Sequence, residues 1–280
     1  MMTGKRIRLD RLFSRGNAVI IAADHGEFDG PIPGMIDLPR TLAAAINPDV
    51  DAVLLSPGMV AHCSGLFSRR GGPLAVVRIN WSSVYAFHWG YNEAATVQAA
   101  TVEDALARGA DLVLVSLSLR TGSEERDARN VEVFCRLVNE ANRLGVPAIG
   151  EFFPTHSTEL TAEQMHEQVY SGARIVAELG ADLVKTFYTH RFSEVAAACP
   201  IPILGLGAER TPTQLQALQL AEREVRDGAR GVVFGRNALQ VPDPRRFQAA
   251  LCAVVRDGMT AEQAAGEFAL AETSASGEKP

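Results

Sequence analysis

The sequence contains very little lysine for a chain of 280 residues. Its 27 basic residues include only three lysines, Lys5, Lys185 and Lys279, and the rest are arginines. A genome that favours arginine codons explains this bias, but it does not explain a lysine inside an apolar segment. A buried position rejects lysine unless its charge is paired or lost. Lys185, which lies in such a segment, therefore needs a chemical explanation.

Other features are also scarce or missing. The four cysteines are widely spaced, which favours buried thiols in a reduced cytoplasmic protein over a disulfide framework or a zinc site. The six histidines lack metal-site spacing, and neither a Gly-x-Ser-x-Gly elbow nor a Walker A motif occurs. No run approaches the ~20 apolar residues of a membrane helix, and the first residues do not resemble a secretory signal. We therefore expect a cytoplasmic protein without a metal or other cofactor.

The net charge of −6 argues against nucleic acid or a membrane surface as a partner. The sequence instead shows short apolar runs that alternate with longer amphipathic stretches, as strands covered on both faces do. The runs are 18–24, 51–56, 74–80, 111–117, 146–152, 182–188, 201–207 and 231–237. Eight such runs favour an α/β fold with a closed (β/α)8 TIM barrel over an open doubly wound sheet. We expect one barrel domain over residues 1–271 and a disordered tail over 272–280.

Helix boundaries fit the same pattern. Residues 161–164 and 211–214 read as capping boxes, the second with proline at the first helical position. Ser123 is a candidate N-cap for a helix that ends at Gly145. A helix end, a glycine and a strand recur at 108–111, 179–182 and 227–230, which indicates three similar turns into strands.

In such barrels the functional residues lie at the carboxyl ends of the strands and in the following loops. Polar residues and glycines gather at those ends of the predicted strands. They are Asp24, His25, Ser56, Arg78, Asn80, Ser116, Ser118, Glu151, Lys185, Tyr188, Gly205, Gly207, Gly235, Arg236 and Asn237. We therefore expect an active site at this rim, with Arg78 and Asn80 among its binding residues.

Lys185 is the candidate nucleophile. A lysine amine attacks a carbonyl only when it is neutral, and burial or a nearby cation such as Arg78 or Arg236 lowers its pKa from ~10.4. The resulting iminium withdraws electrons and stabilises a carbanion at the neighbouring carbon, which aldol cleavage requires. The alternatives are a lysine paired with a buried carboxylate, or one that binds phosphate as a point charge.

Each of the other candidate residues has a functional and a structural interpretation. Gly205, Gly207 and Gly235 with Arg236 suit a phosphate site in the last two loops, although glycines are also common in ordinary turns. Asp24 is a candidate proton-handling group or a turn residue, and His25 a catalytic or a packed residue. Glu151 is a candidate base or the ion-pair partner of an interior arginine. Tyr188 belongs to the site only if the chain turns after Lys185. The aromatic segment 81–89 is a candidate lid or oligomer contact.

Three segments resemble the class I (Schiff-base) aldolases of the archaeal-type fructose-bisphosphate aldolase and deoxyribose-phosphate aldolase superfamily. They are residues 24–31, 178–189 and 231–237. The resemblance implies that Lys185 forms the Schiff base, that Asp24 orients a hydroxyl or handles a proton, and that Gly205, Gly207, Gly235 and Arg236 hold phosphate.

The sequence departs from this family at two motifs and in the loop after the third strand, where Asn80-Trp81 is unusual. The family's strand-5 motif often has a Tyr-Pro pair whose tyrosine is the acid/base, and here it reads Phe153-Pro154. Tyr188, His156 or Glu151 would then have to replace that tyrosine. The loop at 205–210 lacks the family's common Gly-Gly-Pro-Lys, and Arg210 would have to replace its lysine. These departures make fructose bisphosphate a poor default substrate.

We therefore expect a Schiff-base-forming carbon–carbon lyase that acts on a small phosphorylated ketose or aldehyde and assembles as a homo-oligomer. One alternative is transaldol or acyl transfer on a phosphorylated sugar or diketone of the autoinducer-2-phosphate type. The other is a sugar-phosphate-binding barrel without catalysis.

Overall fold

Eight parallel strands close into a barrel in the computed structural model, which describes residues 2–86, 89–91 and 93–270. The order around the barrel is β1-β10-β9-β8-β7-β6-β3-β2. The barrel strands are β1 (Ala18–Ala22), β2 (Ala52–Leu55), β3 (Leu74–Arg78), β6 (Leu112–Leu117), β7 (Ala148–Phe152), β8 (Leu183–Thr186), β9 (Ile203–Leu206) and β10 (Gly231–Phe234). Each lies inside one predicted run, so the predicted TIM barrel is confirmed. The predicted tail at 272–280 lies outside the described residues.

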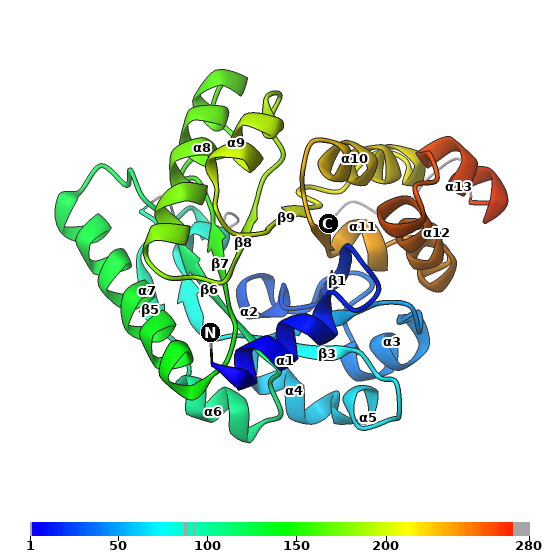
Figure 1. Cartoon of the computed structure of the whole chain (residues 1–280), viewed down its shortest axis with the longest axis horizontal. Helices are drawn as coiled ribbons and strands as arrows, with labels where there is room; N and C mark the ends of the chain where they lie inside the picture. Colours follow the sequence, from blue (N-terminus) through cyan, green and yellow to red (C-terminus); the bar gives the residue numbers. More distant parts are fainter. Residues whose placement is uncertain (1, 87–88, 92, 271–280) are drawn as a thin grey trace.

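Helices surround this barrel (Figure 1). They are α1 (Thr3–Leu12), α2 (Gly26–Asp29), α3 (Leu38–Ala45), α4 (Pro57–His62), α5 (Ser64–Phe67), α6 (Val102–Ala107), α7 (Glu124–Leu144), α8 (Ala162–Glu178), α9 (Phe192–Ala198), α10 (Gln214–Arg226), α11 (Arg236–Leu239), α12 (Pro244–Asp257) and α13 (Ala261–Glu267). After β3 the chain adds an antiparallel pair, β4 (Asn80–Ser82) and β5 (Thr96–Gln98), and a 3-10 turn, η1 (Ser83–Tyr85).

The predicted helix ends are mostly confirmed. The capping box at Thr161 is present, Ser123 caps α7, and Gly145 ends that helix in the left-handed conformation. The box predicted at residues 211–214 is wrong, because α10 begins later and Thr213 is its N-cap. The backbone N–H of Thr211 instead donates to Asn237 Oδ1 at 2.8 Å, which holds the loop before α10 against the end of β10.

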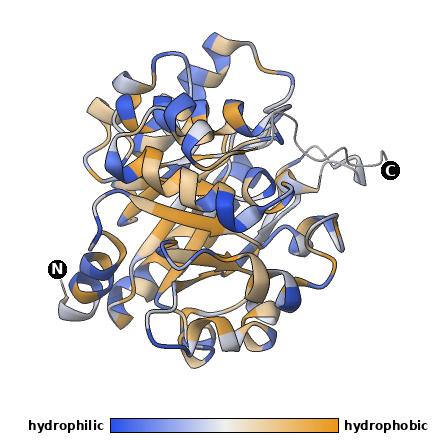
Figure 2. Cartoon of the chain, turned by 90° about the vertical axis from the view of Figure 1, so that its right-hand side faces the viewer, coloured by the Kyte–Doolittle hydropathy of each residue, from blue (hydrophilic) through white to orange (hydrophobic). Residues whose placement is uncertain are grey.

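Apolar side chains fill the barrel and separate it from the helices. The strands at the centre of the molecule are accordingly coloured as hydrophobic in Figure 2. Alternate residues of each strand point inward, for example Ile20, Leu54 and Leu114, and the residues between them pack against the helices. Leu12 of α1 joins the interior cluster, so α1 covers the amino-terminal end of the barrel. Lys5 of α1 is also buried, and its Nζ pairs with Asp182 at 2.6 Å. Burial alone therefore does not single out Lys185.

The residues that point into the barrel become polar at the carboxyl ends of the strands. Asp24, Arg78, Ser116, Glu151 and Lys185 each lie two positions after an inward apolar residue, so the same alternation turns them inward. Register then sets the neighbours, since Glu151 pairs with Ser116 across β6 and β7 and with Lys185 across β7 and β8. These polar side chains form a layer above the apolar side chains that fill the barrel interior.

The described residues show no disulfide, metal cluster or membrane-spanning helix. All four cysteines are free, and three of them are buried. The described residues hold no cluster of three or more His, Cys, Asp or Glu side chains suited to a metal ion. Among the same residues no helix is both long enough and apolar enough to span a membrane.

Glu224 of α10 is a fully buried carboxyl behind β9. A Cβ atom added to Gly205 would lie 2.2 Å from its carboxyl carbon, so only glycine fits at position 205. Neither carboxyl oxygen has a hydrogen-bond partner within the described ranges. Burial raises the pKa of Glu224 well above its usual value, because the charged form loses its hydration. We infer that Glu224 is protonated in the folded protein.

We expect Glu224→Met to stabilise the protein increasingly as pH rises from 5 to 8. The folded state binds this proton more tightly than the unfolded state, so its contribution is complete below the unfolded pKa and is lost on raising the pH. The free energy of unfolding of the wild type then falls, relative to that of the variant, by up to about 1.4 kcal/mol per pH unit. Urea unfolding at pH 5, 6.5 and 8 measures the difference, with exposed Glu167→Met as control. A difference independent of pH would contradict a protonated Glu224.

Candidate active site

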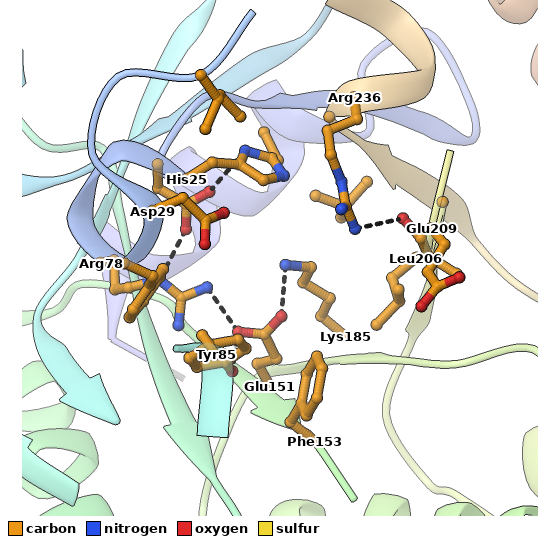
Figure 3. A pocket seen from close by; sticks show the side chains of 18 of the residues that line it. His25, Asp29, Arg78, Tyr85, Glu151, Phe153, Lys185, Leu206, Glu209 and Arg236 are labelled. Atoms are coloured by element: carbon orange, nitrogen blue, oxygen red, sulfur yellow. Dashed lines mark hydrogen bonds and ion pairs between the residues drawn. The ribbon is translucent and has the colours of Figure 1, made fainter. Parts of the chain in front are cut away.

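A cavity of about 990 Å³ opens at the carboxyl ends of the barrel strands. Residues from both halves of the chain line it, including the loop after β1 and the strands β3, β7 and β8 (Figure 3). The predicted site residues found in its lining are Asp24, His25, Arg78, Glu151, Lys185, Gly207, Gly235 and Arg236. The fold therefore gathers these side chains around one space large enough for a sugar phosphate.

Lys185 lies at the floor of this cavity. Its side chain is 8% exposed, and its Nζ lies 2.5 Å from Glu151 Oε1. The pairing with a buried carboxylate that we considered as an alternative is thus present in the resting site. It does not remove the lysine from the cavity, because Lys185 still lines the cavity. The amine is therefore placed both to meet a ligand and to exchange a proton with Glu151.

Arg78 connects the two carboxylates of the polar layer. Its Nε lies 2.7 Å from Asp24 Oδ2 and its Nη2 lies 2.7 Å from Glu151 Oε2, while Nη1 donates to Ser116 Oγ. The side chain is only 2% exposed. A buried guanidinium with a carboxylate at each end fixes both carboxylates through charge-assisted hydrogen bonds.

These charges set the protonation states in the cavity. Burial alone would raise the pKa of Asp24 and of Glu151, but the charges of Arg78 and Lys185 outweigh burial and hold both pKa values below their usual range. Burial lowers the pKa of His25, and Arg236 and Lys185 lower it further against the opposing charge of Asp24. Asp24 and Glu151 are thus carboxylates, and His25 is a neutral imidazole, at pH 7.

The opposite side of the cavity is suited to an anion. Arg236 points into it (Figure 3), with Nη2 3.3 Å from Ala208 O and a buried Nε that has no hydrogen-bond partner in the described part of the chain. Asn237 donates to Gly207 O at 2.7 Å and so joins the two loops. A Cβ on Gly235 would lie 2.3 Å from the His25 ring, so glycine is required there.

The structure corrects three predicted site residues. Gly205 faces away from the cavity toward Glu224, because strand alternation turns it outward. The Tyr188 hydroxyl donates to Asp227 Oδ2 at 2.6 Å outside the barrel, since the residue lies an odd number of positions after Lys185. Asn80 is fully buried and bonds with the backbone of Ser116, so it supports β6 rather than contacting a ligand.

Sequence reasoning missed Tyr85, which enters the cavity from η1. Its hydroxyl lies 2.7 Å from Glu151 Oε2 and 2.9 Å from Ser116 Oγ. The available signal was the aromatic segment 81–89, whose residues 87 and 88 lie outside the described part. Within that segment Tyr85 lines the cavity, whereas Trp89 is exposed.

This geometry agrees with comparisons to known proteins. Residues 18–241 match the model of the DeoC/LacD family aldolases. An uncharacterized aldolase of Saccharolobus solfataricus is 31% identical over 91% of this chain and 96% of its own length. A 3-hydroxy-5-phosphonooxypentane-2,4-dione thiolase of Klebsiella pneumoniae is 29% identical over 93% of this chain and 84% of its own length.

Among solved structures, a Schiff-base-forming fructose-1,6-bisphosphate aldolase superimposes with a TM-score of 0.76 at 26% identity. The match covers 90% of this chain and all of the other. The family match spans the whole barrel and includes Lys185 at the cavity floor. The chain therefore belongs to the DeoC/LacD family of aldolases, as the resemblance predicted, and is an enzyme of the class I aldolase type.

Proposed function

We propose that this enzyme makes or breaks a carbon–carbon bond in a small phosphorylated ketose or aldehyde through a Schiff base on Lys185. The observation that carries the proposal is the Lys185 amine at the floor of a large cavity, 2.5 Å from the Glu151 carboxylate. A lysine that only paired charge would not need to face a cavity of this size. Neither the substrate nor the bond cleaved is fixed by the family.

The first steps use the Lys185–Glu151 pair. Glu151 accepts a proton from the ammonium, and the neutral amine then adds to the substrate carbonyl to form a carbinolamine. Glu151 returns this proton to the leaving hydroxyl, so loss of water gives the iminium and leaves Glu151 as a carboxylate again. Arg78 keeps Glu151 in place through these steps, because its Nη2 holds the other carboxyl oxygen at 2.7 Å. The iminium then accepts the electron pair of the breaking carbon–carbon bond and becomes an enamine.

Asp24 is suited to orient the substrate. Its Oδ2 is occupied by Arg78, and His25 Nδ1 lies 4.0 Å from its Oδ1. Oδ1 therefore accepts a hydrogen bond from a substrate hydroxyl. The phosphate would lie across the cavity at Arg236, where Gly207 and Gly235 let the backbone approach an anion closely.

Transfer rather than cleavage is a second candidate. It is supported by the similarity to the 3-hydroxy-5-phosphonooxypentane-2,4-dione thiolase, over most of both chains. The two functions share the Lys185 adduct and differ in what accepts the released fragment. Product analysis with and without an added acceptor distinguishes them. The presence of the complete Lys185–Glu151–Arg78 arrangement within this cavity disfavours a barrel that only binds sugar phosphates. Assembly as a homo-oligomer stays a prediction.

Borohydride should trap a sugar phosphate on Lys185. We expect an adduct with at least one of dihydroxyacetone phosphate, fructose 1,6-bisphosphate and 2-deoxyribose 5-phosphate. Trypsin does not cut after a modified lysine, so the adduct should appear in mass spectra as a peptide of residues 175–191. Lys185→Met should abolish both the adduct and turnover, because methionine fills the space without an amine.

The matched control is Lys5→Met, which removes the other buried lysine from the far end of the barrel. Lys5→Met should lower stability and leave trapping on Lys185 intact in the folded fraction. Turnover that survives in Lys185→Met, or an adduct that maps to another residue, would refute the proposed nucleophile.

Arg236→Met tests whether Arg236 binds the phosphate of the substrate. A hydrogen bond to a charged group contributes about 1.5–3 kcal/mol, so we expect KM for the trapped sugar phosphate to rise about 10- to 100-fold. The value of kcat should change less, because the phosphate is bound equally before and during the reaction. Steady-state kinetics measures both, with exposed Arg70→Met as control. An unchanged KM would show that the anion binds elsewhere.

A further inference from the structure

We propose that Tyr85 is the group that takes the proton from the substrate hydroxyl during carbon–carbon cleavage, and that it does so by passing its own proton to Glu151. The inference rests on the proposed Schiff-base function and adds the proton-transfer residue to it. The Tyr85 hydroxyl lines the cavity and lies 2.7 Å from Glu151 Oε2. Lys185 occupies the other oxygen of the same carboxylate at 2.5 Å. One carboxylate therefore joins the nucleophile and the phenol.

Two neighbouring candidates in the cavity, Asp24 and His25, are less suited to this proton. Asp24 is held by Arg78, and its pKa lies below its usual value because the charges of Arg78 and Lys185 outweigh burial. His25 is a neutral imidazole whose Nδ1 has no hydrogen-bond partner among the described residues, so no hydrogen bond at that atom orients it for proton transfer. Compared with these two groups, Tyr85 has both a proton of its own and, in Glu151, an acceptor at hydrogen-bond distance.

Tyr85 is also held rigidly. Its ring lies between Phe28, with centroids 4.5 Å apart, and Phe153, with centroids 4.7 Å apart. The Arg78 guanidinium carbon lies 4.8 Å from the Tyr85 ring centroid. Phe153 lines the cavity without a group that exchanges protons, and its ring supports the phenol that has one. The hydroxyl is therefore kept against Glu151 through packing on two sides and a cation on a third.

Burial and the neighbouring Glu151 charge raise the pKa of Tyr85 well above its usual value, so it is a neutral phenol at rest. A neutral phenol can still move a proton if it gives up its own at the same time. The substrate O–H bond breaks as a new O–H bond forms on Tyr85. The original O–H bond of Tyr85 breaks as one forms on Glu151 Oε2. The carbon–carbon electron pair moves to the iminium, which becomes the neutral enamine.

The timing of this transfer follows from the charges. Arg78 and Lys185 are the two cations that hold the pKa of Glu151 below its usual value, against burial. When the iminium becomes an enamine, the nitrogen of Lys185 loses its charge, and only Arg78 remains. The pKa of the buried Glu151 then rises, so the carboxylate becomes a better proton acceptor as the carbon–carbon bond breaks. Reversal of the same path returns the proton when the enamine is protonated.

The test separates adduct formation from cleavage in Tyr85→Phe. With the sugar phosphate that the wild type traps best, we expect borohydride trapping on Lys185 to persist in the variant. Single-turnover cleavage should fall about 10²- to 10⁴-fold, the usual contribution of a positioned acid/base group. Tyr91→Phe is the matched control. Tyr91 also lies between β4 and β5 but is half exposed, so this variant should cleave at the wild-type rate.

Chemical rescue distinguishes proton transfer from packing. Tyr85→Ala leaves a space between Phe28 and Phe153 that accepts a small aromatic ring. Added phenol should restore part of the cleavage rate, and toluene should not, because toluene fills the space without a hydroxyl. Equal rescue by both, or wild-type cleavage in Tyr85→Phe, would overturn the inference while the Lys185 adduct still stands. Failure of the wild type to form any adduct would instead overturn the proposed function, and with it this inference.

Discussion

The buried guanidinium of Arg78 is the interaction on which the active site depends. It holds Asp24 at one end and Glu151 at the other, each at 2.7 Å, and is almost inaccessible to water. Two carboxylates at the end of an apolar barrel would otherwise favour their neutral forms, as Glu224 does behind β9. Arg78 keeps them charged, and charged carboxylates in fixed positions allow the Lys185 amine to be placed between a proton acceptor and the open cavity.

The active site therefore works as one coupled charge system. Glu151 interacts with Arg78, Lys185 and Tyr85 at the same time, so a change in the charge of any one of them alters the proton affinity of Glu151. The covalent chemistry proposed for Lys185 changes the charge on its nitrogen several times in each cycle. A fixed carboxylate beside that nitrogen converts each change into a proton movement without any large motion of the chain.

Much of this architecture could be predicted from sequence because it follows local rules. Period-two alternation and short apolar runs gave the eight strands, and strand ends gave Asp24, Arg78, Glu151 and Lys185. Gly205 and Tyr188 were misplaced although the same alternation, applied to Leu204 and Lys185, turns both away from the cavity. Tyr85 was beyond local rules, because its position depends on how a turn after β3 folds back across β6 and β7. No spacing in the chain encodes that contact.

Helix α1, at the amino-terminal end of the barrel, limits how reactants and products enter and leave the enzyme. Leu12 of α1, with Leu9 and Phe13 beside it, closes the amino-terminal end of the barrel, which is opposite the cavity. Reactant and products then share one mouth. In the proposed Schiff-base reaction, a fragment bonded to Lys185 stays deep in the cavity while the unattached fragment leaves through the mouth, and any second reactant enters by the same route. The closed floor thus imposes an order on release and entry that an open-ended barrel would not.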